Sequence, residues 1–209
     1  MKKIIPYKTP KNALEELDNG GRFYNLITKA NDGNINSAEL GKVAGIMSDK
    51  QKMVLFLELS LSKLSGDSRK EILKTLSPDL KSAIKKYSAQ YLLPSEANEK
   101  GVLAENSIIE GIPKYLESKS EFNGFIMVPV MTGKVTSFMM IPIIDHYNIY
   151  ELRDNISSEA FLIAHSKESD QLPEKRMTFG GILKELKKKK DEEAPTSNYL
   201  EIHYYSDEL

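Results

Sequence analysis

The sequence contains no cysteine, and this absence excludes several classes of chemistry. Without thiols the chain forms no disulfide, no thiolate metal site and no cysteine nucleophile. Histidine is also scarce, with 3 residues in 209, so few side chains are suited to general acid–base work near neutral pH. The sequence has neither a Gly-x-Ser-x-Gly elbow nor a phosphate-binding loop. We therefore expect no cofactor.

Long hydrophobic runs are missing as well. No window approaches the roughly 20 apolar residues that a helix needs to cross a bilayer. The apolar start of the chain ends at once at Pro6, Tyr7 and Lys8, which argues against a signal peptide. A formal net charge of -1 gives no general attraction to nucleic acid or anionic lipid. We expect a soluble cytoplasmic protein without a membrane partner, and the charge argues against a nucleic-acid partner.

Residues 1–118 carry helix-capping signals followed by apolar residues spaced three and four apart. The helices predicted from these signals begin near Asn36, Ser48, Ser68, Ser77 and Ala104. The run from Met53 to Leu64 is the longest and most apolar, so we expect it to be the central helix, ended by Gly66. The last helix is predicted over 104–112, where Pro113 should interrupt or bend it.

From Phe122 the pattern changes to short runs rich in β-branched and aromatic residues, separated by turns. The segment Thr132-Gly133-Lys134 is typical of a hairpin turn between the first two runs. Six strands are predicted, over Phe125–Met131, Thr136–Ile144, Tyr147–Arg153, Ala160–His165, Arg176–Leu186 and Tyr199–Tyr205.

The predicted strands also contain residues that interrupt a regular ladder. Pro129 and Pro142 should lie on edges or at bulges, because proline lacks a backbone N–H. The pair Gly180-Gly181 indicates a bulge or barrel corner rather than a phosphate cradle, since no helix follows it. The sequence therefore predicts an α+β protein with an N-terminal helical bundle, residues 1–118. A six-stranded antiparallel β-barrel or curled sheet should follow over residues 119–209.

The segment 32–36, with the sequence DGNIN, resembles an EF-hand calcium loop when taken together with Glu39. Gly33 falls at the sixth loop position and Glu39 at the twelfth, as in EF-hands. Thr28 and Ala30 occupy the first and third ligand positions, where EF-hands carry acidic residues. The candidate ligands are therefore few, and calcium binding through them should be weak: Asp32, Asn34, Asn36 and Glu39. The alternative interpretation is a turn followed by a helix cap.

The three histidines form the second candidate metal site. His146, His165 and His203 all lie in the predicted β half, at or near strand ends. If their strands are neighbours, the imidazoles can meet in a zinc or iron site, with Asp145 or Glu201 as a further ligand. No two of them have local ligand spacing, so this hypothesis depends on the fold. Surface or half-buried histidines without a metal are the alternative.

Two features of the sequence bear on nucleic-acid binding. The run Lys187–Lys190 is basic, but Asp191, Glu192 and Glu193 follow it and cancel most of its field, so we expect a solvated loop. A small barrel is similar to the OB-fold, which binds single strands on stacking aromatics. That fold normally has five strands and a helix between the third and fourth. Six predicted strands and the short segment Glu168–Glu174 argue against it.

The function predicted from these observations is a non-enzymatic binding protein, with its partner on the β domain or in the groove between the halves. Four methionines cluster in the first predicted hairpin, and methionine adapts to pliable interfaces, although it also fills cores. They are Met127, Met131, Met139 and Met140. We expect a protein partner or self-association through an exposed strand edge. The alternatives are a metal-dependent or small-molecule enzyme with histidines at the barrel mouth, and a weakly calcium-responsive protein.

Overall fold

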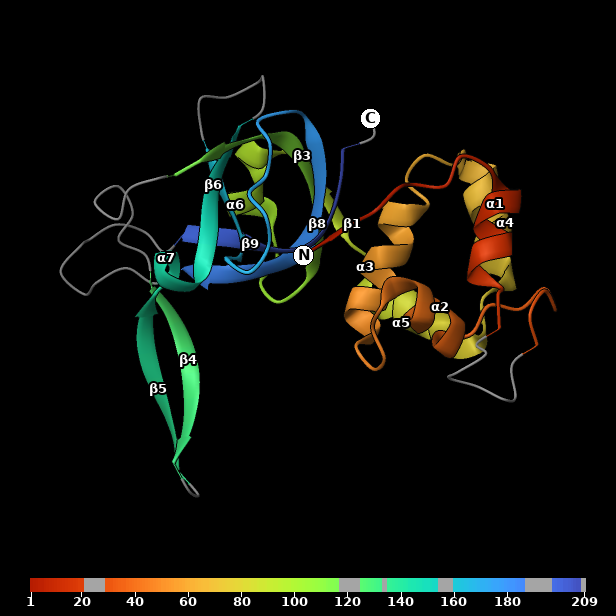
Figure 1. The fold of residues 1–209 in the computed structure, drawn as a ribbon, viewed down its shortest axis with the longest axis horizontal. Coiled ribbons are helices and arrows are strands. Elements are labelled where there is room, and N and C mark those ends of the chain that lie inside the picture. The colour runs from red at the N-terminus through yellow and green to blue at the C-terminus, as the bar shows by residue number, and fades with distance from the viewer. Residues whose placement is uncertain (21–28, 117–124, 133–134, 154–159, 187–196, 208–209) are drawn as a thin grey trace.

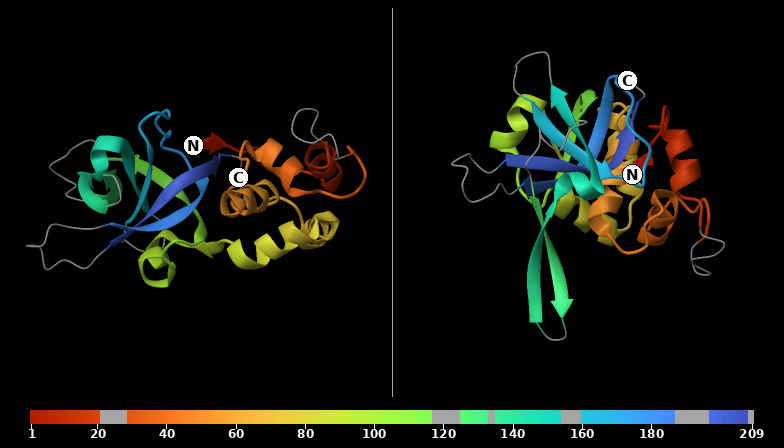
Figure 2. Two further views of the ribbon diagram at one scale, coloured as in Figure 1. Left: turned by 90° about the horizontal axis from the view of Figure 1, so that it is seen from below. Right: turned by 60° about the vertical axis from the view of Figure 1, so that its left-hand side comes forward.

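The computed structural model describes residues 1–20, 29–116, 125–132, 135–153, 160–186 and 197–207. Helices of the first part of the chain lie against one side of a closed β-barrel, so the protein is an α+β protein (Figure 1). A separate two-stranded hairpin projects away from the barrel (Figures 1 and 2). None of the helices in the described residues is both long and apolar enough to span a bilayer.

The helical part contains five helices among the described residues before the first barrel strand, besides two shorter helical turns. They are α1 (Pro10–Leu17), α2 (Ser37–Ala44), α3 (Lys50–Ser60), α4 (Gly66–Thr75) and α5 (Pro78–Tyr87). The two shorter pieces, η1 (Pro94–Glu96) and α6 (Ala97–Lys100), lie against the barrel. The predicted capping box of α2 is confirmed: the Asn36 side chain accepts from the N–H groups of Ala38 and Glu39. The Glu39 carboxylate in turn accepts from the Asn36 N–H at 3.0 Å.

Two predicted helix boundaries are wrong, because in each place a neighbouring residue caps the helix instead of the predicted one. The N-cap of α3 is Asp49 rather than Ser48, because the Asp49 carboxylate accepts from the Lys52 N–H at 3.1 Å. Gly66 does not end a helix but begins α4, since the Ser65 hydroxyl caps it by accepting from the Ser68 N–H. In both places the helix starts after the residue whose side chain accepts from the backbone N–H of the third helical residue.

Helix α3 is the central helix of the molecule, as predicted. Seven of its residues are buried, and they lie around most of its circumference: Met53, Val54, Leu55, Phe56, Leu57, Leu59 and Ser60. The helix contacts α2 and α5 on one side and the strands β3, β8 and β9 on the other. A helix that is apolar nearly all round must be covered on several sides, so α3 joins the helices to the barrel.

The helix predicted over 104–112 is wrong, because this segment is the ten-residue strand β3 (Asn106–Tyr115). Its first half pairs with β8 and its second half with β6, so β3 belongs to both sides of the barrel. Consecutive isoleucines then face opposite ways: Ile108 packs with the helices and Ile109 inside the barrel. The strands β1, β2 and β3 all precede residue 119. The division of the chain into two domains at that point stays a prediction.

The barrel closes with five strands rather than the predicted six. They are β3, β6 (Tyr147–Arg153), β7 (Phe161–Ser166), β8 (Met177–Leu186) and β9 (Ser197–Ser206). Around the barrel the order is β3-β6-β7-β9-β8 and back to β3, with β7 and β9 parallel and all other pairs antiparallel. Two short strands extend this sheet, β1 (Lys2–Lys3) along β9 and β2 (Gln90–Leu92) along β3, both parallel.

Numbered along the chain, the barrel strands have the order 1-2-3-5-4, which is the strand order of the OB-fold. The strand count that argued against this fold is therefore corrected. Residues 167–176, between the third and fourth barrel strands, contain turns and no helix, as predicted from the short segment Glu168–Glu174. The interior is filled by aromatic and aliphatic side chains, with Tyr150, Phe161 and Phe179 among the largest that are fully buried.

A β-bulge lies where β8 meets β9, as the glycine pair predicted. Gly180 pairs with Tyr204 and Gly181 with Ile202, so His203 has no residue opposite it. A Cβ on Gly181 would overlap the carbonyl oxygen of Glu201, so glycine is needed for this close approach. The extra residue reverses the alternation of β9: Ile202 packs inside the barrel, whereas Tyr204 packs with the helices.

The first predicted hairpin is present but lies outside the barrel. Its strands are β4 (Phe125–Thr132) and β5 (Val135–Pro142), and within the described residues they pair only with each other. Pro129 and Pro142 were predicted at edges or bulges, and they lie on edge strands, since within the described residues β4 and β5 pair only with each other. The short helix α7 (Ile143–His146) connects β5 to β6, where the prediction extended the strand to Ile144. We call this hairpin, residues 125–132 and 135–142, the arm.

Candidate functional site

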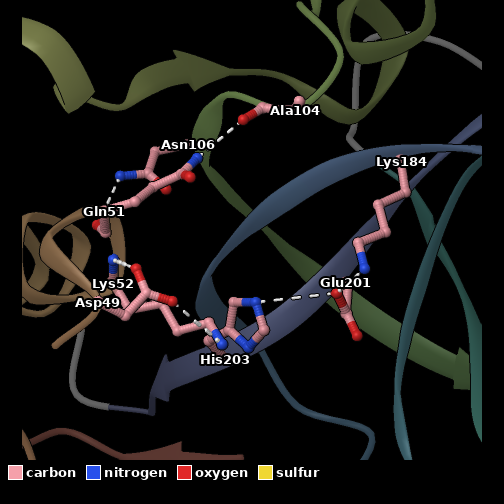
Figure 3. Close-up of polar contacts among 8 residues, drawn as sticks. All are labelled: Asp49, Gln51, Lys52, Ala104, Asn106, Lys184, Glu201 and His203. Atoms are coloured by element: carbon pink, nitrogen blue, oxygen red, sulfur yellow. Dashed lines mark hydrogen bonds and ion pairs between the residues drawn. The ribbon is translucent and has the colours of Figure 1, made fainter. Parts of the chain in front are cut away.

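A group of four charged side chains and one histidine lies between the N-terminal end of α3 and the outer face of the barrel (Figure 3). We call it the α3–β9 cluster; its members are Asp49, Lys52, Lys184, Glu201 and His203. Asp49 is the N-cap of α3 and Lys52 lies in its first turn, whereas the other three come from β8 and β9. His203 is the bulged residue of β9, and it lies on the same outer face of the strand as Glu201, because Leu200 and Ile202 beside and between them pack inside the barrel.

Glu201 is the best-connected member of the cluster. Its carboxylate accepts a hydrogen bond from the Tyr147 hydroxyl at 2.8 Å and forms an ion pair with the Lys184 ammonium at 2.6 Å. Burial by itself raises the pKa of the Glu201 carboxyl, but the hydrogen bond and charge of Lys184, followed by Tyr147, outweigh it. The pKa therefore lies below its ordinary value, and Glu201 is ionised at neutral pH.

His203 lies beside this ion pair but is not bonded to it. Its Nε2 atom is 3.8 Å from a Glu201 oxygen, too far for a hydrogen bond, and it is buried without a partner among the described residues. Burial lowers the pKa of His203 to about 4; the like charges of Lys52 and Lys184 act in the same direction, and the carboxylates of Glu201 and Asp49 oppose them. The imidazole is therefore neutral at physiological pH.

The same region ties the helices to the start of β3. The Gln51 side chain donates to the Ala104 carbonyl at 2.8 Å (Figure 3). The Asn106 amide donates to the carbonyl of Gln51 at 2.9 Å and to that of Tyr87 at 2.7 Å. These three bonds connect the start of α3 and the end of α5 to residues 104–106 at the start of β3, beside the cluster.

The chemistry available to the cluster is limited. Two lysines balance two carboxylates, and the imidazole between them is neutral. Within the described ranges, no three histidine, aspartate or glutamate side chains converge as a metal site would require. The cluster lies where α3 contacts β8 and β9, and the low pKa of His203 predicts that acid weakens this contact.

The other two histidines, His146 and His165, are not part of the α3–β9 cluster. His146 is exposed on α7. His165 is buried at one end of the barrel, where its Nδ1 donates to the Ser166 carbonyl at 2.9 Å and its Nε2 lies 3.2 Å from the Tyr150 hydroxyl. Burial lowers the pKa of His165, so it acts as a neutral member of a buried network. The structure thus does not bring the three histidines together.

The EF-hand-like segment is organised as a turn and a cap. Asp18, which is buried at the end of α1, accepts the N–H groups of Asp32 and Gly33 at 3.3 and 2.7 Å. Asn36 and Glu39 are occupied with the capping box of α2. Burial raises the pKa of Glu39, as do the nearby carboxylates of Asp18 and Asp32, although the hydrogen bond from the Asn36 N–H lowers it. Asp32 and Asn34 are exposed, whereas Thr28 lies outside the described residues.

The four candidate methionines all lie on the arm. Met127 and Met140 are directly opposite each other, Met139 is opposite Val128, and Met131 is opposite Thr136. The remaining basic candidate, Lys187–Lys190, lies outside the described residues.

The register divides the positions of the arm between two faces, because every second residue of a strand lies on the same face and opposite residues share a face. One face consists of Phe125, Met127, Pro129, Met131, Thr136, Phe138, Met140 and Pro142. The other consists of Ile126, Val128, Val130, Thr132, Val135, Ser137, Met139 and Ile141. Neither face contains a charged residue, and both are dominated by apolar residues.

Sequence reasoning missed the α3–β9 cluster and the isolation of the arm. The glycine pair pointed to the bulge, but no local spacing relates Lys52 to His203.

Comparison with known proteins adds no assignment: no family model matches the chain, and no curated protein matches it either.

Proposed function

We propose that this chain is a non-enzymatic binding protein, and that a protein partner covers the arm. The helices and the barrel are the rigid support in this proposal, and the arm is the binding element. The observation that carries it is an uncharged, apolar hairpin that pairs with no other strand in the described residues and projects from the barrel (Figures 1 and 2).

Both faces of the arm are apolar, so a partner that covers either of them gains binding energy from the burial. A two-stranded hairpin is marginally stable in water on its own, because it cannot bury either face. Burying one methionine or phenylalanine side chain contributes about 1.5–3 kcal/mol. One face carries Met127, Met131 and Met140 beside two phenylalanines, so covering it supplies a binding energy typical of a protein interface. A polypeptide partner is favoured over a small molecule because the arm is extended rather than concave.

The base of the arm suits this role. β4 contacts β8 of the barrel, and β5 contacts α7, which continues directly into β6. The arm is therefore held at one end by a packed barrel. A binding element on a rigid support loses less conformational entropy when its partner binds.

Nucleic-acid binding is not supported by the barrel, despite its OB-fold strand order. The aromatic side chains that such a fold uses for stacking are here in the interior, including Tyr150 and Phe161. The outer face of β6, β7 and β9 carries Ile149, Ala164 and Tyr199, which are buried in a cluster with Ile143 of α7 and Leu186.

The test uses a photocrosslinking amino acid placed at single positions in the cells that make the protein. Probes at Val128 and Met140 sample the two faces of the arm, and a probe at Lys70, an exposed residue of α4, is the control. We expect one defined polypeptide adduct from the arm and none from Lys70. The substitution Met139→Glu, opposite Val128, should abolish the adduct. Met47→Glu, the same change at an exposed methionine of the helical part, should not. Failure to obtain an arm-specific adduct would contradict the proposal.

A further inference from the structure

We infer that the arm associates with a second copy of this chain through the outer edge of β5. This inference rests on the proposed function of the arm as a protein-binding element. It follows from the position of one proline, from the hydrogen-bonding geometry that this proline implies, and from the absence of charge along both strands.

Pro129 makes the two edges of the arm different. It lies in the middle of β4, opposite Phe138. Proline has no N–H, so a ladder accommodates it where the nitrogen points away from the partner strand. The nitrogen of Pro129 therefore faces the outer edge of β4. That edge lacks a donor at its centre, which blocks the addition of another strand there.

The same pairing fixes which groups of β5 face outward. In an antiparallel ladder, residues that do not exchange hydrogen bonds with each other both direct their N–H and C=O groups away from the pair. Because Pro129 and Phe138 form such a pair, the N–H and C=O of Phe138 face the outer edge of β5. The groups of Thr136 and Met140, two residues to either side, face the same way. Pro142 stands only at the end of the strand.

These outward groups are self-complementary. A two-fold axis through the strand centre places Phe138 opposite Phe138 of the second copy, and Thr136 opposite its Met140. Aromatic residues directly opposite each other stabilise an antiparallel pair. Natural proteins prevent such edge pairing with charged residues, and β4 and β5 contain none. Two copies thus form one four-stranded sheet, above the minimum of three strands that an independent sheet needs.

The cysteine-free sequence allows a direct test with single cysteines in the full chain. In the inferred pair the Cα atoms of the two copies of residue 138 lie about 5.5 Å apart, within the range of about 4.4–6.8 Å that disulfides span. Phe138→Cys should therefore give a covalent dimer on oxidation. Met127→Cys, on the blocked strand β4, should stay monomeric under the same conditions. Equal crosslinking of the two variants would overturn the inference.

A second measurement does not depend on disulfide formation. Sedimentation of the unmodified chain over a roughly hundredfold range of concentration should show a monomer–dimer equilibrium. Phe138→Lys places like charges on the two-fold axis and should weaken association at least tenfold. Val130→Lys, on β4 and the opposite face, adds the same charge away from the axis and should weaken it less. Circular dichroism should show that both variants remain folded.

The outcomes separate this inference from the proposed function. A chain that stays monomeric and gives an arm adduct with a different polypeptide overturns the second copy and leaves the proposed function intact. A chain that gives no arm adduct in cells and no dimer in solution overturns both. Dimerisation that Phe138→Lys and Val130→Lys weaken equally overturns the assignment to the edge of β5.

Discussion

Acid should destabilise this protein through His203, and the variant His203→Gln should remove that sensitivity. The folded protein holds the imidazole neutral, with a pKa of about 4 against 6.5 for an ordinary histidine, mainly because it is buried and also because Lys52 and Lys184 lie nearby. Glutamine keeps a polar side chain of similar size but does not titrate. The comparison therefore isolates the proton from the packing.

The magnitude follows from linkage between protonation and folding. Between pH 6.5 and 4 the unfolded chain binds more protons at this residue than the folded chain does, so the free energy of unfolding falls as the pH is lowered. The contribution is complete above pH 6.5. At about 1.36 kcal/mol for each pKa unit, the loss is about 3 kcal/mol at most.

The assay is urea unfolding followed by circular dichroism at several pH values from neutrality down to 4. The wild-type chain should lose more stability over this range than His203→Gln, by up to about 3 kcal/mol. His146→Gln removes an exposed histidine and should follow the wild type. If His203→Gln and the wild type lost the same free energy, the account of the α3–β9 cluster would be wrong.

Three further predictions concern single side chains, each measured as the free energy of urea unfolding. Asn36→Ala removes the cap of α2 and should cost about 0.5–2 kcal/mol, while millimolar calcium should give no binding heat with the wild type if the turn-and-cap interpretation is right. Gly181→Ala should cost more than about 2 kcal/mol, because its Cβ overlaps the Glu201 carbonyl; Gly66→Ala, with open space around it, should stabilise by up to about 1 kcal/mol. Leu55→Ala should cost about 2–5 kcal/mol, since Leu55 is fully buried in α3.

Local signals in the sequence predicted helices α2 to α5, but they missed α1 and wrongly predicted a helix over 104–112. The capping box at Asn36 and Glu39 and the apolar run of α3 both depend on residues within one or two turns of each other. The same locality explains the errors at Ser48 and Gly66, where an adjacent residue was the better cap. Such signals identify a helix more reliably than they locate its first residue.

Strand partners could not be predicted in the same way. The isoleucines at 108, 109 and 112 have spacings that fit a helix as well as a strand, and only pairing with β6 and β8 decides between them. The arm shows a second limit of pattern reasoning. A run of apolar residues indicates a strand, but it does not show which sheet the strand joins.

The candidate sites also differ in whether their residues are close in sequence or are brought together by strand pairing. The methionines were found because they are close in sequence, whereas the α3–β9 cluster depends on contacts between residues about 150 positions apart. The bulge that leaves His203 without an opposite residue requires Gly181, which the sequence did show as one of a glycine pair. That His203 is the residue left unpaired could be seen only from the register of β8 against β9.

Methionine oxidation tests the claim that a protein partner covers the arm most directly. Met47 is 79% exposed and Met53 is 2% exposed, so the chain carries its own fast and slow references. In the cells that make the protein, Met127 and Met140 should oxidise much more slowly than Met47; in dilute purified protein they should approach its rate. Arm methionines that oxidise in cells as fast as Met47 would contradict the account.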